Sequence, residues 1–422
     1  MPPPNLPKRT LPGYADLRLA VVSPFVDRRH GTERALAELL ERLATKEHCE
    51  IHLYAQRVDH LAIDQAGVTH VRKSGAIIWH KVLSIPGPYL LQFLTWLFLN
   101  SVSRAWDRWV HGLRFDLVVS PGINCLDADV IIVHALFHRL REVSPGEARD
   151  SAKSGFLRRF HRRAYYALLA QLERLIYVDP KVSLAAVSQR AANLLNDFFR
   201  RQDIRVIPNG VDVKQFSPST RLALREQARS RRNIRESDLV LLLIGNDWRV
   251  KGLDSVLRAV ATLRELPFLV IAAGDDSPGS FRETAKLLGV LERCRFESSR
   301  EDVLDLYACA DLYVSPTLED SFGLPAAEAM ACGLPVVTSV NAGVAELIHD
   351  GIDGFILRQS DDFQTLAQLL KRLHADKILR GSIGESAAKA ALDWTWDRNA
   401  AEVWELLKDA AGGKTVSTAS NP

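Results

Sequence analysis

The chain has 422 residues, which is too long for one hydrophobic core and favours two domains of about 100–200 residues each. Hydrophobic residues make up 47% and charged residues 25%, the composition of a soluble globular protein that can form a large core. The formal net charge of +3 is nearly balanced, so the charge gives no argument for nucleic-acid binding.

The five cysteines are scattered, odd in number and without paired short spacings, which predicts a reducing compartment and no zinc site. They are Cys49, Cys125, Cys294, Cys309 and Cys332. The N-terminus has no apolar run of the kind a signal peptide needs, so we expect a cytoplasmic protein. Residues 1–14 are expected to be disordered, and residues 411–422 are expected to form a flexible tail.

Short apolar runs alternate with helical stretches through the first half of the chain. The first strand is predicted at residues 17–22, and the helix that follows has Thr32 as its predicted N-cap. The apolar positions of that helix, spaced by three and four, are Leu36, Leu39, Leu40 and Leu43. Further buried parallel strands are predicted at residues 51–54, 117–119, 130–133 and 184–187. This alternation predicts a doubly wound α/β domain over residues 15–207.

Two stretches of this first half have the character of a membrane interface. Residues 85–99 are apolar but shorter than the ~20 residues that span a bilayer, and a buried core helix explains them equally well. Residues 156–177 begin with basic and aromatic residues interleaved, the pattern of a helix that lies on anionic lipid. These residues are Arg158, Arg159, Arg162 and Arg163 together with Phe156, Phe160, Tyr165 and Tyr166. A solvated basic helix is the alternative to an anionic membrane surface as its partner.

The alternation is interrupted near residues 207–212, where Asn-Gly predicts a turn, and it resumes after a polar, arginine-rich segment. Strands are then predicted at residues 239–244, 268–273, 312–314, 335–338 and 355–357. They predict a second doubly wound domain over residues 208–390, followed by a helix at residues 391–410 that can pack back on the first domain. The dinucleotide fingerprint Gly-x-Gly-x-x-Gly is missing from the first strand-helix turn, which argues against a dehydrogenase.

A basic loop follows the first strand of the second domain. Its sequence is Gly-Asn-Asp-Trp-Arg-Val-Lys-Gly over residues 245–252, and it precedes an apolar helix. Because ligands bind at the carboxyl edge of parallel sheets, Arg249 and Lys251 are candidates to neutralise a diphosphate in place of a metal ion. Two basic residues in a surface loop can also simply be solvated.

Residues 316–336 place carboxylates on both sides of a predicted helix start, with Pro325 opening the helix and Gly333 ending it. The N–H groups of residues 322–324 would lie at the positive end of that helix, where a phosphate binds. Asp320 in the loop and Glu328 in the helix can accept hydrogen bonds from sugar hydroxyls. Taken singly, each acid has an ordinary structural explanation, as a turn residue or as a favourable charge near a helix start.

Together these residues resemble the signature of retaining glycosyltransferases of family four, whose GT-B fold has two Rossmann-like domains facing each other across a cleft. The family pattern is an acid, seven residues and a glutamate. It is matched here by Asp320, followed by Ser321-Phe322-Gly323, and by Glu328, followed by Ala-Met-Ala. The family usually has glutamate at the first acid. Glu319 lies one position earlier, so both acids remain candidates for that role.

The resemblance also implies site residues in the first domain. Residues 30–34, His-Gly-Thr-Glu-Arg, are similar to the family's Gly-Gly-x-Glu-Arg loop, which makes Gly31 a candidate on the acceptor side. His134 follows the predicted strand 130–133, where the family commonly has a histidine that contacts the transferred sugar. His138 is the weaker candidate, and a histidine at a strand end can also be purely structural.

The family resemblance implies a role for each residue of the second-domain site. Lys251 and Arg249 would contact the diphosphate, Glu328 the ribose, and Asp320 or Glu319 the sugar hydroxyls. The backbone N–H groups of Phe322, Gly323 and Leu324, beside Ser321, would contact sugar and phosphate. No metal or other cofactor is expected, because the basic loop and the helix start already supply positive charge to the phosphates.

The implied function is transfer of a hexose from a nucleotide diphosphate sugar to a lipid-linked, lipopolysaccharide-type or other glycan acceptor at the cytosolic membrane face. Residues 245–263 are similar to a segment of lipopolysaccharide core glucosyltransferases, which favours UDP-glucose. Two alternatives remain: a nucleotide-sugar epimerase of the same fold, and a non-catalytic scaffold protein that binds sugar nucleotides at the membrane.

Overall fold

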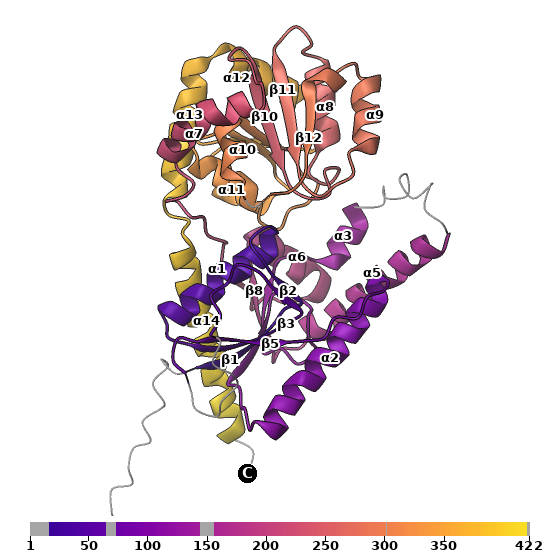
Figure 1. Cartoon of the computed structure of the whole chain (residues 1–422), viewed down its shortest axis with the longest axis vertical. Helices are drawn as coiled ribbons and strands as arrows, with labels where there is room; N and C mark the ends of the chain where they lie inside the picture. The colour runs from indigo at the N-terminus through magenta and orange to yellow at the C-terminus, as the bar shows by residue number, and fades with distance from the viewer. Residues whose placement is uncertain (1–16, 65–72, 144–155, 301, 420–422) are drawn as a thin grey trace, which may run out of the picture.

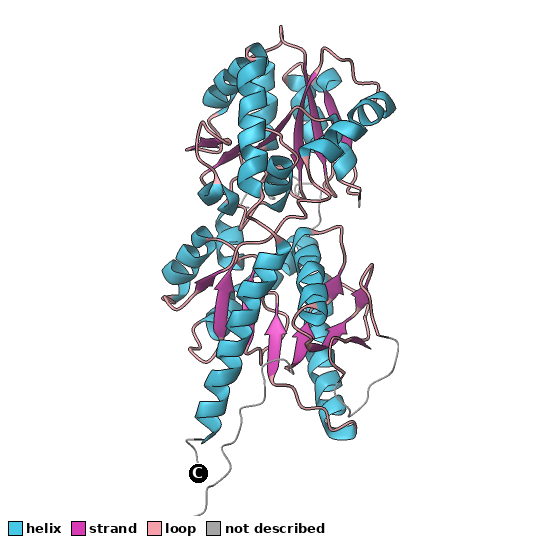
Figure 2. Cartoon of the chain, turned by 90° about the vertical axis from the view of Figure 1, so that its left-hand side faces the viewer, coloured by secondary structure: helices cyan, strands magenta, loops and turns pink. Residues whose placement is uncertain are grey.

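The computed structural model describes residues 17–64, 73–143, 156–300 and 302–419, and they form two α/β domains stacked along the long axis (Figure 1). Each domain has a twisted parallel sheet with helices on both faces, as the view turned by 90° also shows (Figure 2). This is the doubly wound architecture predicted from the alternating apolar runs. The expected disorder of residues 1–14 falls outside the described residues.

The sheet of the first domain has the strand order β5-β3-β1-β6-β7-β8-β9, with all pairs parallel. Its strands are β1 (Arg18–Val22), β3 (Glu50–Ala55), β5 (Ile77–Lys81), β6 (Leu117–Ser120), β7 (Val130–Val133), β8 (Ser183–Ala186) and β9 (Arg205–Val206), and β2 (Phe25–Val26) pairs with β4 (Arg57–Val58) beside it. Its helices are α1 (Gly31–Thr45), α2 (Tyr89–Val110), α3 (Phe137–Val143), α5 (Phe156–Tyr177) and α6 (Gln189–Phe199).

The sheet of the second domain has the strand order β12-β11-β10-β13-β14-β15, again with all pairs parallel. Its strands are β10 (Leu239–Ile244), β11 (Phe268–Ala273), β12 (Cys294–Glu297), β13 (Leu312–Ser315), β14 (Val336–Ser339) and β15 (Phe355–Leu357). Its helices are α7 (Pro218–Arg231), α8 (Leu253–Ala261), α9 (Gly279–Leu287), α10 (Leu304–Cys309), α11 (Leu324–Ala331), α12 (Phe363–Ala375) and α13 (Lys377–Ala391), with short 3-10 turns η2 (Leu291–Arg293) and η3 (Gly343–Leu347).

The strand order places a switch point in each sheet, between β1 and β6 in the first domain and between β10 and β13 in the second. On either side of this point, successive strands are added to the sheet in opposite directions. The loops after the two strands therefore lead away from each other, and a crevice for a ligand opens at the carboxyl ends of the strands. In the second domain those loops are residues 245–252 and 316–323. The fold therefore brings the predicted basic loop and acid loop to one place.

One helix start differs from its prediction. We expected Thr32 to cap the first helix, but α1 begins at Gly31 and His30 is the N-cap residue, without a side-chain cap. The preceding turn is instead held by Asp27, whose Oδ1 accepts the N–H groups of Arg29 and His30. Because this carboxylate fixes the chain before the helix, the first turn forms two residues earlier than the hydroxyl of Thr32 indicated.

The chain passes between the domains twice, and the two crossings are bonded to each other. The N–H of Val211 donates to the carbonyl of Trp394 at 2.7 Å. The side-chain amide of Asn399 donates to the carbonyl of Pro208 at 2.8 Å. The Asn-Gly turn predicted at residues 207–212 is therefore one half of a paired connection, and the segment before the C-terminal helix is the other.

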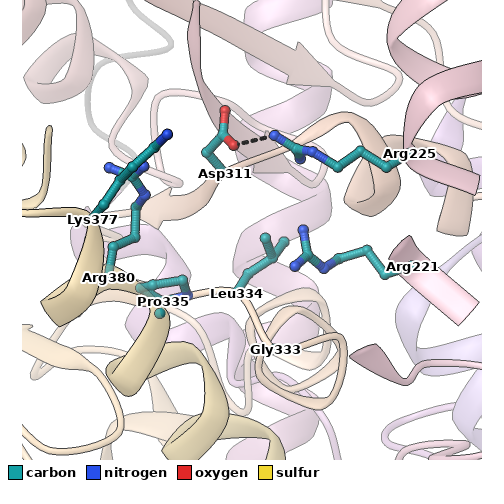
Figure 3. A pocket seen from close by; sticks show the side chains of 9 residues that line it. Arg221, Arg225, Asp311, Gly333, Leu334, Pro335, Lys377 and Arg380 are labelled. Atoms are coloured by element: carbon teal, nitrogen blue, oxygen red, sulfur yellow. Dashed lines mark hydrogen bonds and ion pairs between the residues drawn. The ribbon is translucent and has the colours of Figure 1, made fainter. Parts of the chain in front are cut away.

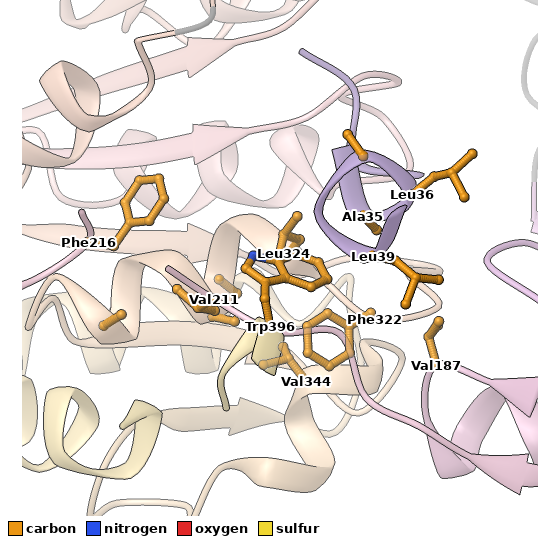
Figure 4. Close-up of a cluster of buried hydrophobic side chains, with 14 of the residues drawn as sticks. Ala35, Leu36, Leu39, Val187, Val211, Phe216, Phe322, Leu324, Val344 and Trp396 are labelled. Atoms are coloured by element: carbon orange, nitrogen blue, oxygen red, sulfur yellow. The ribbon is translucent and has the colours of Figure 1, made fainter. Parts of the chain in front are cut away.

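Helix α14 (Trp396–Ala419) returns from the second crossing to the first domain, where Asp397 pairs with Arg42 of α1 at 2.8 Å. Gly210 lets the crossings touch, since a Cβ at that position would lie 2.2 Å from the backbone nitrogen of Trp396. A cluster of buried apolar side chains continues from α1 through these crossings to α11 (Figure 4). Its members drawn there include Ala35, Leu36, Leu39, Val211, Phe322, Leu324, Val344 and Trp396.

Candidate active site between the two domains

Glycines bring the two loops at the switch point of the second sheet into contact. Gly252 has φ +84°, and a Cβ there would lie 2.2 Å from the carbonyl oxygen of Pro316. Gly245 lets the Lys251 side chain lie over the backbone, since its Cβ would be 2.8 Å from Lys251 Cε. The N–H of Leu318 donates to the carbonyl of Val250 at 2.7 Å, which joins the loops further. Lys251 is therefore held in position rather than freely solvated.

The centre of the site is an ion pair between these loops. Lys251 Nζ lies 2.5 Å from Asp320 Oδ2, and about a fifth of each side chain is exposed. Glu319 lies beside Asp320 in sequence but turns towards the first domain. There its Oε2 accepts hydrogen bonds from Arg139 at 2.9 Å and from Arg190 at 2.6 Å. The two acids that the sequence left as alternatives thus have different partners, and Asp320 is the one beside the predicted diphosphate lysine.

Helix α11 begins at this ion pair. Its N-cap residue, Gly323, has φ +94°, and Pro325 lies in the first turn, as the sequence predicted. Within the described residues, the N–H groups of Phe322, Gly323 and Leu324 have no acceptor. They are buried, and they lie at the positive end of the helix, so they are oriented donors for an anionic oxygen.

Glu328 lies one turn into α11 and is only 2% exposed. Its carboxylate pairs with the guanidinium of Arg34 from α1 and accepts a hydrogen bond from the hydroxyl of Tyr307 at 2.8 Å. Burial raises the pKa of Glu328, and Arg34 opposes that rise. Arg34 thus covers the carboxylate of Glu328 from the side of the first domain.

His134 follows β7 at the carboxyl edge of the first sheet and is partly buried. Burial lowers the pKa of its imidazole to about 4, so the ring is neutral near pH 7 and can both donate and accept a hydrogen bond. His138 has a structural contact instead, with its Nδ1 2.5 Å from Glu173 Oε2. The same carboxylate accepts the N–H groups of Phe137 and His138 at the start of α3.

The remaining predicted site residues line the same region. Gly31 is exposed at the start of α1, and a Cβ there would meet no atom within 4 Å. His30 before it reaches the second domain, with its Nε2 3.5 Å from Asp275 Oδ2. Arg249 is partly exposed, and among the described residues its guanidinium makes no ion pair. The carbonyl of Ser321 accepts a hydrogen bond from the hydroxyl of Ser188 at 2.6 Å.

The sequence interpretation missed a set of contacts across the domain boundary. The N–H groups of Gln189 and Arg190 at the start of α6 donate to the carboxylate of Glu346 in η3. Arg139 and Arg190 hold Glu319, as described above. The sequence could have indicated Arg34, because this residue ends the His-Gly-Thr-Glu-Arg loop. Arg139 and Arg190 resemble ordinary surface residues in the sequence. These contacts join the two domains.

The described residues do not bring three His, Cys, Asp or Glu side chains together in a way that could hold a metal ion. Two surface cavities lie away from the ion pair. One, of about 190 Å³, is bordered by α7 and α13, and the other, of about 630 Å³, by the segment before β5. The site described above is built from the converging loops at residues 245–252 and 316–323.

Two doubly wound domains whose sheet edges meet in this way define a GT-B architecture. Residues 29–215 match Glycosyltransferase Family 4, and residues 225–390 match Glycosyl transferases group 1. The chain therefore belongs to the glycosyltransferases that combine these two domains.

Individual proteins are similar to this chain in sequence or in fold. A D-inositol 3-phosphate glycosyltransferase of Salinispora arenicola is 33% identical over 223 residues, which are 49% of this chain and 50% of that protein. The match thus spans about half the length of this curated relative. The structure of WaaG, a glycosyltransferase involved in lipopolysaccharide biosynthesis, has a TM-score of 0.69 at 21% identity and covers 93% of this chain and 98% of its own. Anabaena Alr3699/HepE in complex with UDP-glucose has a TM-score of 0.62 at 19% identity, covering 95% and 100%.

Proposed function

We propose that the protein is a retaining glycosyltransferase that transfers a hexose from a nucleotide diphosphate sugar to a lipid-linked, lipopolysaccharide-type or other glycan acceptor. The observation that carries this proposal is the pairing of Lys251 with Asp320 beside the start of α11. A lysine and free N–H groups can stabilise a departing diphosphate, while a carboxylate can hold the sugar hydroxyls. UDP-glucose is the proposed donor, supported by the UDP-glucose complex of the Anabaena neighbour.

The proposed reaction takes place on one face of the sugar. The bond from the anomeric carbon to the phosphate oxygen breaks, and the acceptor oxygen bonds to the same carbon from the same side. The acceptor proton passes to the departing phosphate. Lys251 and the N–H groups of Phe322–Leu324 stabilise the charge that develops on the phosphate. His134, neutral near pH 7, hydrogen-bonds to the transferred sugar from the first domain.

The direct test is turnover with a panel of UDP-, GDP- and ADP-sugars in the presence of a bacterial lipid extract. We expect saturable consumption of one donor, with the labelled hexose recovered on the extracted acceptor. Release of a free, epimerised sugar nucleotide would instead identify an epimerase. Binding of a donor without any turnover would identify a scaffold protein.

The reaction is proposed to need no divalent metal, because Lys251 and the start of α11 would supply positive charge to the phosphates of a bound donor. We expect activity to persist, within about twofold, in excess EDTA. The check is an initial-rate assay with and without EDTA, followed by addition of Mg²⁺ or Mn²⁺. Complete loss in EDTA, restored by either ion, would contradict the proposed stabilisation of the leaving group.

A membrane-bound acceptor is supported by the unusual polarity of α2. Its buried face is mostly polar, with Asn100, Arg104 and Asp107 turned inward. Its exposed face is apolar at a spacing of three and four, which is the reverse of a surface helix on a soluble protein. The exposed apolar residues of this face are Leu91, Leu94, Phe98, Val102, Trp106 and Trp109. Phe98 is 67% and Trp109 82% exposed.

The buried polar face of α2 has partners in the sheet and in the loop before β7. Asp107 accepts a hydrogen bond from the hydroxyl of Tyr54 at 2.7 Å and lies 2.7 Å from His80 Nδ1. Arg104 pairs with Asp127 at 2.7 Å. These bonds fix which face of the helix is outward, so the apolar face is held towards the surroundings. No helix in the described residues is long and apolar enough to cross a bilayer.

Helix α5, predicted from its arginines and aromatic residues to lie on anionic lipid, runs beside α2 (Figure 1). Tyr165 of α5 contacts the ring of Phe93 of α2, with centroids 5.8 Å apart. The side chains of residues 156–162 lie outside the described residues, and Arg163 is exposed. An apolar face next to a basic helix is the combination that binds an anionic membrane surface.

We expect the triple substitution Phe98→Ser, Trp106→Ser and Trp109→Ser to reduce binding to anionic vesicles more than tenfold, because the apolar insertion is lost. Replacing Arg158, Arg159, Arg162 and Arg163 by Gln should also release the protein, at about 1 kcal/mol for each charge. Vesicle co-sedimentation at low and high salt is the measurement. Ile378→Ser, an exposed apolar change in the second domain, is the control. Equal binding of all variants to neutral and anionic lipid would leave these faces without a membrane role.

A second acceptor class follows from the curated relatives, which are named for D-inositol 3-phosphate. A phosphorylated cyclitol is small and water-soluble, so its transfer would need no vesicle. Turnover with D-inositol 3-phosphate in detergent-free buffer would favour this acceptor, whereas turnover that depends on lipid would favour the first proposal.

A further inference from the structure

A cationic cavity lies on the second domain at the opposite end of α11 from the donor loops. Its volume is about 190 Å³, and its charged lining consists of Arg221, Arg225, Lys377, Arg380 and one acid, Asp311. Figure 3 shows the two arginines of α7 reaching in from one side and the two cations of α13 from the other. Four cations therefore surround one carboxylate.

The single carboxylate is already fully engaged. Asp311 accepts hydrogen bonds from Arg225 at 2.5 Å, from Arg229 at 3.2 Å and from the N–H of Val240 at 2.8 Å. Asp376 lies near the other wall, but its carboxylate caps α13 by accepting the N–H of Leu379 at 2.8 Å. The lining thus keeps an excess of positive charge after its acids are counted.

Three of the four cations bond carbonyls at helix ends, and one does not. Arg221 and Arg225 donate to the carbonyls of Cys332 and Ala310, where they close the ends of α11 and α10. Arg380 donates to the carbonyl of Leu373 in the last turn of α12 at 2.6 Å, and within the described residues its guanidinium makes no ion pair. Lys377 is exposed and has no hydrogen bond or ion pair within the part of the chain described.

The positive charges also repel each other. Burial and the neighbouring Arg225 lower the pKa of Arg221, and burial lowers the pKa of Arg380, with Arg225 adding to the effect. Guanidinium groups stay charged in proteins, so this crowding favours an anion between them. Planar guanidinium forks that approach from two sides suit the oxygens of a tetrahedral phosphate.

The size of the cavity decides which phosphate compound fits. Sites for drug-sized ligands occupy about 300–1,000 Å³, so 190 Å³ is too small for a sugar nucleotide. Gly333 at the wall also follows α11, which separates the cavity from the donor loops by the eight residues of that helix, about 12 Å. We propose that this cavity is a second anion site, which binds inorganic phosphate or a small phosphate monoester independently of the donor site. The inference does not depend on the proposed transferase activity.

The test is calorimetric titration of inorganic phosphate into the full-length protein, at constant ionic strength set with chloride. We expect saturable binding that the double substitution Lys377→Ala and Arg380→Gln weakens at least tenfold, because charge-assisted bonds are lost. The single variant Lys377→Ala should weaken it in the same direction and, being exposed, should leave the melting temperature in chloride unchanged. Lys389→Ala, an exposed change further along α13, is the matched control.

Phosphate can also occupy the donor site, so Lys251→Ala is titrated in parallel. Binding that survives in Lys251→Ala and falls in the α13 variants supports the second site. Binding that is lost in Lys251→Ala, or that is equal in wild type and the double variant, would overturn it. Glycerol 3-phosphate in place of phosphate distinguishes the ligands: equal affinity indicates recognition of the phosphate group alone, and tighter binding indicates a monoester.

Discussion

Replacing Lys251 by alanine is expected to lower the turnover of sugar transfer roughly 10²–10³-fold, the scale of losing one preorganised charge at a developing anion. The lysine is held over Gly245 and paired with Asp320, so its position is fixed before the donor arrives. A fixed charge needs little reorganisation when the diphosphate leaves. The loss should therefore fall on kcat and not only on KM.

Steady-state kinetics with the preferred donor measure this effect. Lys251→Met keeps most of the aliphatic side chain and should lose as much activity as Lys251→Ala, which isolates the charge. Lys286→Ala, an exposed change on α9, should retain wild-type turnover. Unchanged turnover of both Lys251 variants would remove this residue from the mechanism.

Asp320→Asn is expected to impair turnover at least about tenfold more than Glu319→Gln. Asp320 lies beside Lys251, so its loss removes a charge-assisted contact at the predicted sugar and phosphate position. Glu319 instead binds Arg139 and Arg190 of the first domain. Its neutralisation should weaken domain closure and raise KM, with a smaller effect on kcat.

Kinetic constants of the two single variants, measured side by side with the same donor, provide the comparison. Thermal melts of both proteins control for a general loss of stability. If Glu319→Gln proves the more damaging change in kcat, the acid of the signature is Glu319, and the sequence match is shifted by one residue.

The central strands were predictable because they are buried on both faces. The strands β1, β6, β7, β10 and β11 read as continuous apolar runs, as a parallel sheet covered by helices requires. The strands missed in the two main sheets, β5, β9 and β12, all lie at sheet edges, and the short pair β2 and β4 was missed as well. An edge strand has one neighbour and less need for apolar residues, and β12, Cys-Arg-Phe-Glu, is only half-buried. The local hydrophobicity of the sequence therefore does not predict β12.

The site divides in the same way between local and tertiary signals. Pro325 and Gly333 define the limits of α11 in any context, so this helix could be predicted from residues 316–336 alone. The partners of Glu319 could not be predicted, because Arg139 and Arg190 are separated from it by 180 and 129 residues in the sequence. No spacing rule in a single sequence relates such distant residues. Only the closed domains bring them together.

The double connection between the domains restricts how they can move. A single chain crossing would allow the domains to rotate about the long axis. Two crossings, joined by the hydrogen bonds from Val211 to Trp394 and from Asn399 to Pro208, resist this rotation. Bending of the domains about the two crossings, as about a hinge, remains the softer motion. The paired crossings therefore help to set the relative orientation of the two sheets, whose carboxyl edges carry His134 and Lys251. The bond from Val211 to Trp394 joins backbone to backbone, so this part of the orientation does not depend on the identity of any side chain.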